Sequence, residues 1–560
     1  MKKSFVSVFN IMIVMVFSGV LHGQNTVGLQ YLKPGAVYEG YNLIYPHNQP
    51  NVYLLDQCGE IVNIWTDAAN FRPGNTAYIL PDGKLVKTKR ENNILVDSIW
   101  AGGGGAIVEI LDWGNNLLYS FEQNDSLFRL HHDIAPMPNG NILMIVWEKK
   151  TVEEALMAGR RPDLLPGGEL WPEAVWEWNP FLDSIVWRWR LWDHLVQEED
   201  DSKDNYGVVG DHPELVDINY DEHNGHEDWL HMNAIDYNPV LDQIVMSVPY
   251  FNEMWIIDHS TTMSEAAAHT GGNTGKGGDL IFRWGNPATY DRGDESDKQL
   301  YFQHDVSWVN PTATMLDTTF GQISVYNNQA PGGQSPGQVV STQVMDGSFN
   351  YPMTDGVFAP ADFSRTVVYP GTDPRSASVS LSSVQFLSNG NTLLLAGRWG
   401  FAYEVDTNGE LVWEYIVPLK TGSPATQGDT LVINNNLTFR MQRYAADYSA
   451  FEGKNMSPKD YLESEPNEGF CALLLPAPEE EPAAFNFRIY PNPTRDVLHI
   501  ETFDLPTHLH DLSLYDLQGR LIKRIPITGQ WTEINLDELP AGVYLLKTQH
   551  GSTRKIVVTP

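Results

Sequence analysis

The chain has 560 residues, of which 42% are hydrophobic and 11% aromatic, and its formal net charge is −35. This length exceeds a single ordinary core, so we expect several domains or one large repeat fold, and the aromatic content favours a β-rich one. A charge this negative argues against nucleic acid and anionic membranes as partners and is typical of a solvated surface.

The first 23 residues predict an export signal. Lys2 and Lys3 precede a short apolar run that ends in small and polar residues near Gly23. This pattern is typical of a signal peptide, and the run is too short to serve as a membrane span. A buried first strand is the alternative, but such a strand would not be apolar on every face. No later stretch is long enough to cross a bilayer, so we expect an exported protein without a membrane span.

The chain contains two cysteines, Cys58 and Cys471, which lie far apart in the sequence. In the oxidising compartment that an exported protein reaches, such a pair suggests a disulfide. Two unrelated buried thiols are the alternative. A disulfide here would tie the first and last strands of the fold together.

Strand–turn–strand patterns of one plan recur at 77–89, 133–146, 234–248 and 383–397. Alternating apolar residues lead into turns such as PDG, PNG and SNG, which are typical of hairpins. Trp-rich segments that have the pattern of outer strands are interleaved with them. Spaced hairpins in a long all-β chain are typical of a β-propeller, which we expect over residues 24–465.

Residues 197–228 interrupt this pattern with an acidic, polar stretch that is long for a connection. Its carboxylates could hold calcium, but their spacing fits no EF-hand loop. We therefore expect a solvated loop.

The composition changes after about residue 465. A Pro-, Glu- and Ala-rich linker is expected over 466–485, and short alternating strands over 486–560 predict a small, immunoglobulin-like β-sandwich. The motifs YPNP, LYDLQGR, LPAGVYLLK and the terminal KIVV resemble the C-terminal sorting domain of the type IX secretion system. This resemblance implies that the tail is a secretion address, with the type IX machinery as a partner and a secreted or cell-surface location.

Three histidines stand just before equivalent strands of the repeated pattern: His132, His231 and His304. The inner strands of a propeller line its central channel, so equivalent positions in successive repeats converge on one axis. A single histidine at such a position would be structural, whereas three of them indicate a shared pocket.

Several ordered motifs resemble the bacterial aryl-sulfate sulfotransferases over roughly residues 30–465. They include HHDIAPMPNGNIL, DWLHMNAIDYNPVLDQIV, WIIDHSTT, GGDLIFRWGNP, QHDVSWV and LTFRMQRYAADYSAFEG. The resemblance implies a six-bladed propeller that moves a sulfuryl group from a phenolic sulfate ester to a phenol. It also implies a ping-pong mechanism through a sulfohistidine, without the nucleotide donor PAPS, and we expect no cofactor.

Carried over by motif, His304 is the expected nucleophile, because a neutral imidazole nitrogen attacks well near neutral pH. His132 and His231 are expected to bind the sulfuryl oxygens or to protonate the leaving oxygen, and Asn233 to donate its amide. His131 competes with His132, because the doubled histidine leaves the register open.

For other polar residues near these motifs, two roles remain open. Asp133 and Asp305 could orient the imidazoles, or they could be polar residues at strand ends. Some family members carry an arginine one hairpin after the second histidine, where this chain has Pro249. Arg398, in the corresponding hairpin of a later repeat, is the predicted substitute. A surface or structural role is the alternative for Arg398, as it is for Arg440 and Arg443.

Two other classes of function remain open. The three histidines could hold a metal ion in a hydrolase or lyase, although no HExxH or paired-cysteine motif supports this. A non-catalytic propeller that binds glycans or aromatic molecules, with the histidines as polar lining, is the second alternative.

Overall fold

The computed structural model describes residues 25–92, 97–345, 347–474, 486–503, 511–517, 520–527, 529–548 and 553–560. The predicted signal peptide over residues 1–23 lies outside the described residues. Contacts divide the chain into two compact units, 1–474 and 475–560. The start of the predicted linker, up to residue 474, is therefore part of the first unit, and its remainder, 475–485, lies outside the described residues.

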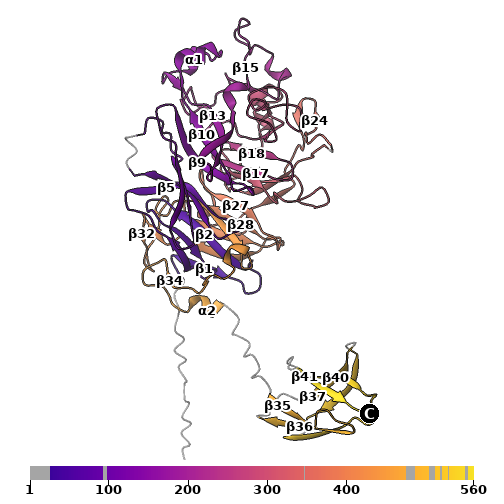
Figure 1. The fold of residues 1–560 in the computed structure, drawn as a ribbon. Coiled ribbons are helices and arrows are strands. Elements are labelled where there is room, and N and C mark those ends of the chain that lie inside the picture. Colours follow the sequence, from indigo (N-terminus) through magenta and orange to yellow (C-terminus); the bar gives the residue numbers. More distant parts are fainter. Residues whose placement is uncertain are drawn as a thin grey trace, which may run out of the picture. The chain divides into compact units, whose positions relative to one another are not determined.

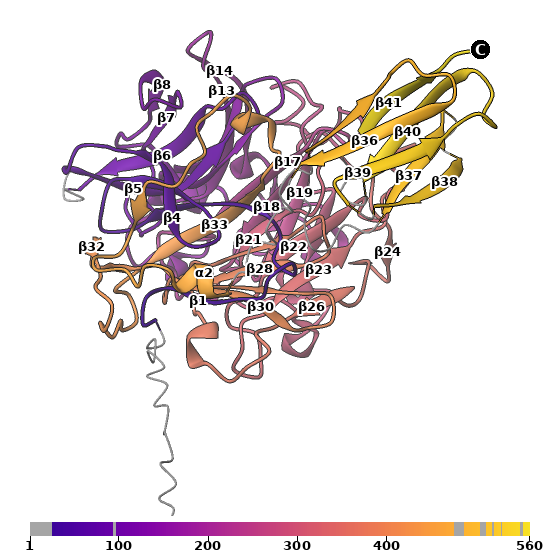
Figure 2. The same ribbon diagram turned by 90° about the horizontal axis from the view of Figure 1, so that it is seen from below.

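Apart from one short parallel pair, Leu195–Val196 with Val216–Asp217, the described part of the first unit is built from antiparallel sheets, which confirms the all-β prediction (Figures 1 and 2). Six of these sheets have four or five strands. In order of pairing they are β5 (Phe71–Ile79), β6 (Leu85–Glu91), β7 (Ile107–Leu111), β8 (Leu117–Glu122); β9 (Phe128–Pro136), β10 (Ile142–Glu148), β13 (Glu173–Asn179), β14 (Ser184–Arg190); β17 (Ala234–Asn238), β18 (Gln243–Val248), β19 (Glu253–Asp258), β20 (Phe282–Trp284); β21 (His304–Trp308), β22 (Gln322–Tyr326), β23 (Gly337–Ser341), β26 (Arg365–Val367); β27 (Ser383–Phe386), β28 (Thr392–Ala396), β29 (Phe401–Val405), β30 (Leu411–Ile416), β1 (Gly28–Leu32); and β33 (Thr438–Ala445), β2 (Gly40–Pro46), β3 (Val52–Leu55), β4 (Glu60–Trp65), β34 (Asp460–Tyr461).

Smaller elements connect these sheets. Two short α-helices are described, α1 (Val152–Met157) and α2 (Phe470–Leu474). The remaining strands are β11 (Lys150–Thr151), β12 (Glu169–Leu170), β15 (Leu195–Val196), β16 (Val216–Asp217), β24 (Met353–Thr354), β25 (Val357–Phe358), β31 (Leu419–Lys420) and β32 (Ser423–Pro424), and the 3₁₀ turns are η2 (Pro162–Leu164), η3 (Leu191–Asp193), η4 (Val209–Asp211), η5 (Pro287–Tyr290), η6 (Glu295–Asp297), η7 (Pro374–Ser376) and η8 (Ser449–Phe451). Within the described residues, no helix combines the length and apolar character needed to span a membrane.

All four predicted hairpins form antiparallel pairs: β5 with β6, β9 with β10, β17 with β18, and β27 with β28. The strands β10, β18 and β28 are buried along their whole length, which explains their continuous apolar sequence. Glycine at a positive φ closes three of the turns, Gly83 at 83°, Gly140 at 85° and Gly390 at 91°. Local pattern and turn chemistry therefore predict these pairs correctly.

We call the strand given first in each of the six sheets above its first strand. These six first strands contact one another in a closed ring. Along the chain, β5 lies against β9, β9 against β17, β17 against β21, β21 against β27 and β27 against β33, and β33 returns to β5. The closing sheet joins the two ends of the unit, because the late strand β33 pairs with the early strand β2. Residues just before or at the start of each first strand are thereby brought together.

One side-chain contact crosses every junction of this ring. Asp133, Asp236 and Asp305 each accept a hydrogen bond from a backbone N–H of the next first strand, at Ile235, Trp308 and Val384. The remaining junctions are crossed by Gln385, which accepts from the Arg443 N–H, by Tyr444, whose hydroxyl accepts from the Ile79 N–H, and by Tyr78, whose hydroxyl donates to Asp133. These bonds fix how far each first strand is shifted along its own direction relative to its neighbours.

The predicted disulfide is confirmed. Cys58 and Cys471 are bonded with a Cα–Cα distance of 5.6 Å, across 413 residues of sequence. Cys58 lies in the turn between β3 and β4, and Cys471 lies in α2, which packs against β1. The bond therefore holds the end of the first unit to its closing region.

The second unit contains two antiparallel sheets that share one apolar core. One sheet contains β35 (Asn486–Tyr490), β36 (Val497–Phe503) and β39 (Trp531–Asn535), and the other β38 (Leu521–Pro526), β37 (Asp511–Asp516), β40 (Gly542–Thr548) and β41 (Thr553–Val558). Leu498 of the first and Leu512 of the second are fully buried in the same cluster. The immunoglobulin-like topology stays a prediction.

Replacing both cysteines with serine should destabilise the first unit by about 2–5 kcal/mol, because the unfolded chain regains the freedom of a very long loop. Urea denaturation with and without reductant measures this difference. Reductant should lower the stability of the native protein and leave the double variant Cys58→Ser/Cys471→Ser unchanged. Equal stability of the oxidised and reduced native protein would contradict the prediction.

Candidate active site

The structure brings the three predicted histidines together around Phe439 of β33. The ring centroids of His132 and His231 lie 4.5 Å apart, and those of His132 and His304 lie 6.2 and 6.0 Å from that of Phe439. His132 comes from β9, His231 lies three residues before β17, and His304 begins β21. Convergence at the start of successive first strands is what the repeated hairpins predicted.

His304 is held in one tautomer by contacts on both ring nitrogens. Its Nε2 lies 3.1 Å from the Leu381 N–H, which donates to it, so Nδ1 carries the proton and donates to Asn328 Oδ1 at 2.8 Å. Burial lowers the pKa of His304 to about 3. The ring is therefore neutral near pH 7, with its lone pair on Nε2.

The other two histidines have different partners. His231 is hydrogen-bonded through Nδ1 to Asp228, a fully buried carboxylate that also accepts from the indole of Trp147 at 2.9 Å. Burial, followed by repulsion from His231, lowers the pKa of His132 well below its usual value, so His132 is neutral. His231 alone among the three has a carboxylate to compensate a positive charge.

His131 lies between His132 and Trp147 rather than next to His231. Its ring stacks on Trp147 with centroids 3.8 Å apart, and its Nδ1 lies 2.9 Å from Nδ1 of His132. The structure thus places His132 next to His231, whereas His131 supports His132 from behind. The predicted Asn233 is fully buried, and its amide donates to the Gln303 carbonyl at 2.9 Å, which leaves its second amide hydrogen for another acceptor.

A run of four glycines, Gly102–Gly105, packs against His132. The Gly103 carbonyl accepts from the His132 N–H at 2.7 Å, and a Cβ on Gly103 would lie 1.8 Å from the imidazole. No side chain fits there, so only glycine allows the loop to close over the ring. The run AGGGGA was the available sequence signal for this contact, and our sequence analysis missed it.

Arg398, the predicted cation, does not contact any of the histidines. It bonds Asn434 Oδ1 at 2.6 Å and Ser380 Oγ at 3.1 Å, next to Leu381, and is half-buried. Tyr250, which follows Pro249, stacks on His231 with ring centroids 4.9 Å apart. Some family members carry an arginine at the position of Pro249. In this chain the next residue, Tyr250, contacts His231 of the site.

Arg440 is the cation that connects the strands of the site. Its guanidinium pairs with Asp133 at 2.8 Å and Asp305 at 2.6 Å, and it bonds the Tyr78 hydroxyl. Burial lowers the pKa of Arg440 to about 9, which still leaves it charged at pH 7. Of the surface or structural role that the sequence left as the alternative for Arg440, the surface role is therefore wrong and the structural role fits. The same holds for Arg443, which is fully buried and paired with Glu404.

The two aspartates that follow the histidines hold strands and the arginine, and neither bonds an imidazole among the interactions described. Burial raises the pKa of both Asp133 and Asp305 well above the usual range, and the guanidinium of Arg440 opposes this rise. Of the two interpretations that the sequence left open, the structure supports polar residues of the strand ends.

The acidic stretch 197–228 is only partly a solvated loop. It contains η4 and β16, Val216 and Ile218 are fully buried, and Asp228 orients His231. The expectation of a solvated loop is wrong for the end of this stretch, because its last residue is part of the site.

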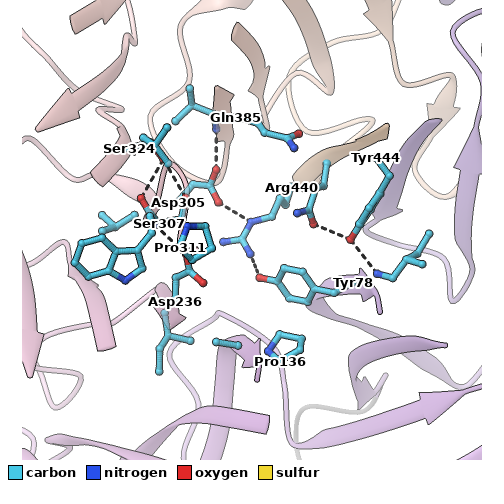
Figure 3. A pocket seen from close by; sticks show the side chains of 18 of the residues that line it. Tyr78, Pro136, Asp236, Asp305, Ser307, Pro311, Ser324, Gln385, Arg440 and Tyr444 are labelled. Carbon is cyan, nitrogen blue, oxygen red and sulfur yellow. Dashed lines mark hydrogen bonds and ion pairs between the residues drawn. The ribbon is translucent and has the colours of Figure 1, made fainter. Parts of the chain in front are cut away.

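Arg440 also lines a cavity of about 450 Å³ (Figure 3). Asp236, Asp305, Arg440, Tyr78 and Tyr444 line it, together with serine and glutamine side chains, and none of the predicted histidines does. The lining residues of β9, β17 and β21 follow the histidines along these strands. Arg440 and Asp305 therefore form part of the wall of this cavity.

Comparisons with known proteins identify two regions. A family model described as arylsulfotransferase (ASST) matches residues 33–370, and one described as a secretion system C-terminal sorting domain matches residues 488–559. Both resemblances noted in the sequence are thereby confirmed. No curated protein matches the chain significantly.

Solved structures show only distant likeness. A protein of unknown function from Bacteroides caccae is 10% identical, with a TM-score of 0.35, over 68% of this chain and 94% of that one. A streptogramin B lyase is 9% identical, with a TM-score of 0.33, over 76% and 96% of the two chains. Scores this low decide neither fold nor function.

Replacing Arg440 with Gln should cost about 3–5 kcal/mol of stability at pH 8, because two buried carboxylates lose their cation. Without that cation the pKa of each carboxylate in the folded state rises further above its unfolded value. Protonation then favours the folded variant as the pH falls, so its deficit against the native protein should shrink towards pH 5.

Arg398→Gln is the matched control, and its cost should be within about 1 kcal/mol at either pH, because Arg398 is half-exposed and bonds neutral groups. Urea midpoints at pH 8 and pH 5 give the comparison. Equal effects of the two substitutions, or a deficit of Arg440→Gln that does not change with pH, would contradict this account of the buried ion pairs.

Proposed function

Since the chain belongs to the arylsulfotransferase family, whose model matches residues 33–370, we propose that it transfers a sulfuryl group from a phenolic sulfate ester to a phenol. The family supports aryl sulfotransferase activity in general. The ping-pong course, the sulfohistidine and the independence from PAPS are the finer parts of this proposal. The observation that carries it is the convergence of His132, His231 and His304, with His304 neutral and its Nε2 lone pair directed at a donor.

We propose His304 as the nucleophile. The lone pair of Nε2 forms a bond to sulfur, the bond from sulfur to the phenolic oxygen breaks, and its electron pair leaves on that oxygen, which takes a proton. Nδ1 keeps its proton, so the sulfated ring becomes cationic, and Asn328 Oδ1 accepts from it at 2.8 Å. In the second half-reaction a phenol oxygen attacks sulfur, the N–S electron pair returns to the ring, and the phenol proton is lost.

The donor that holds Nε2 before reaction becomes available when sulfur takes its place. The Leu381 N–H lies at a residue with φ of 59°, in the left-handed region, followed by Ser382 at 92°. Once displaced from Nε2, this N–H can donate to a sulfuryl oxygen, as the second amide hydrogen of Asn233 can. His231, with Asp228 behind it, is the proposed proton donor to the leaving phenolate.

The charge that develops on the sulfuryl oxygens would thus be stabilised mainly by neutral donors. Arg440 is bound to Asp133 and Asp305, and Arg398 contacts no histidine. We propose that Leu381, Asn233 and His132 take the place of the arginine that some family members carry. Such preorganised N–H donors are each worth about 10²–10³ in rate.

The fold and location follow the same proposal. The closed ring of six first strands supports a six-bladed propeller, and the sorting domain at 488–559 supports secretion or cell-surface location through the type IX machinery. We also propose that residues 486–560 form an immunoglobulin-like sandwich and that a signal peptide, residues 1–23, is cleaved on export. The metal-dependent and purely binding alternatives are outcomes of the tests below.

His304→Asn should abolish both half-reactions, whereas His132→Asn and His231→Asn should slow transfer by about 10²–10³. Mass spectrometry after incubation with an aryl sulfate and no acceptor should show an added SO₃ on the peptide that contains His304. The adduct should disappear when phenol is added, and His304→Asn should show none.

An adduct on His132 or His231 instead would overturn the choice of nucleophile and keep the ping-pong scheme. Sequential kinetics without any adduct would refute the covalent mechanism. Activity that disappears with a chelator and returns with metal would favour the metal-dependent alternative, and no turnover of any aryl sulfate would favour a binding protein.

A chain truncated after Leu474 should keep full transfer activity, because the histidines and their partners all lie in the first unit. The same chain should no longer be exported through the type IX pathway. A chain truncated after residue 465 is the matched comparison, since it lacks Cys471 and should be less stable. Loss of activity in a well-folded chain that ends at Leu474 would show that the tail contributes to catalysis.

A further inference from the structure

A second group of histidines lies outside the proposed active site. His194 Nδ1 and His269 Nδ1 lie 2.8 and 2.7 Å from the same oxygen, Oδ1 of Asp279. These three atoms all lie within 4.8 Å of one another, close enough to share one ion. His194 follows η3, and the other two residues belong to the long connection between β19 and β20.

The hydrogen bonds of His194 favour a cation between the rings and the carboxylate. The Ala266 carbonyl can only accept, so His194 Nε2, 2.9 Å away, carries a proton and donates to it. In the neutral ring, Nδ1 then directs a lone pair at a carboxylate oxygen, which is repulsive unless a proton or a metal ion lies between them. Metal-binding histidines commonly donate their other N–H to a backbone carbonyl in this way.

The surroundings hold this group in place. His194 is fully buried and stacks on Trp189, whose indole donates to the Gly278 carbonyl at 2.7 Å. A Cβ on Gly278 would lie 2.7 Å from His194 Nε2 and 2.1 Å from the Ala266 oxygen, so glycine is required there. Asp279 is buried as well, at 5% exposed, so two of the three ligand residues lie in a packed shell.

The third residue leaves one side open. The side chain of His269 is 61% exposed, and it borders a cavity of about 820 Å³ that Trp192, Lys203 and His212 also line. The site offers three protein ligands, of which two are imidazole nitrogens, and leaves a fourth position open. This set fits a tetrahedral zinc-class ion. Calcium and magnesium prefer sets of oxygen ligands and fit less well.

We propose that His194, His269 and Asp279 bind one divalent transition-metal ion of the zinc class, with a fourth position open to this cavity. The site shares no residue with the three histidines around Phe439. It fastens the connection between β19 and β20 to the segment after β14, and the open position can take water or a small anionic ligand.

Zinc content of the full-length protein tests this proposal. After loading with Zn²⁺ and dialysis, the native protein should hold one zinc ion per chain by mass spectrometry of the metal. Loss of a residue that only supports a metal ligand weakens metal binding by roughly 10–100-fold. His269→Ala removes a proposed ligand itself, so it should weaken zinc binding by at least this factor. Because this ring is largely exposed, the variant should fold normally.

Two control variants identify where the zinc is bound. His226→Ala removes a similarly exposed ring, 52% exposed, outside the group and should keep its zinc. His304→Asn should also keep it, which separates this proposal from metal binding at the proposed active site and from the fate of the sulfotransfer proposal. With cobalt in place of zinc, a tetrahedral absorption band should appear in the native protein and be absent in His269→Ala.

Three results would overturn the proposal. They are a native protein without zinc after loading, equal zinc in His269→Ala and the native protein, and zinc lost from His304→Asn but kept by His269→Ala. The first would identify the group as a hydrogen-bonded histidine–aspartate–histidine cluster without a metal.

Discussion

The structure depends on a ring of polar contacts that passes through the buried inner strands. Each first strand is tied to the next by a side chain that meets a backbone N–H or, at Tyr78, a carboxylate. Buried polar groups are costly without partners, so each of these bonds has few alternative arrangements. Asp133 and Asp305 are the most constrained, because each holds a neighbouring strand and also pairs with Arg440. A shift of one strand by one residue would leave these carboxylates unpaired.

This constraint also sets the proposed active site. His132 and His304 each directly precede one of the two aspartates, so the bonds that fix the strands fix the positions of the rings. His132, His231 and Asp305 have φ of 49°, 57° and 56°, in the left-handed region that non-glycine residues seldom adopt. Such conformations persist only where the surroundings determine them, and here the buried ion pairs do so. Asp133 and Asp305 thus position the imidazoles of His132 and His304 without bonding them, whereas Asp228 bonds His231 directly.

The chemistry that results differs from a site built on free cations. Arg440 is charged but committed to two carboxylates, and the imidazole of His304 is neutral because it is buried. In the proposed reaction, a neutral nucleophile with N–H donors such as that of Leu381 beside it suits a sulfuryl group that already carries negative oxygens, since little charge has to be brought in from water. The proposed zinc-class site of His194, His269 and Asp279 differs from this buried site, because the ring of His269 is exposed and one ligand position is open.

The amino-acid sequence by itself determined the hairpins, the disulfide partners and the set of histidines. These follow from local rules: alternation and turn residues specify a hairpin, two cysteines allow one pairing, and equivalent positions in repeats converge. The partners of Arg440, the role of Asp228 at the end of an acidic stretch, and the loop at Gly103 were decided only by the tertiary structure. Arg440 lies 307 residues from Asp133, and its charge gave no sign of burial. Such contacts depend on which strands meet when the ring closes, and closure is a property of the whole chain that no local pattern contains.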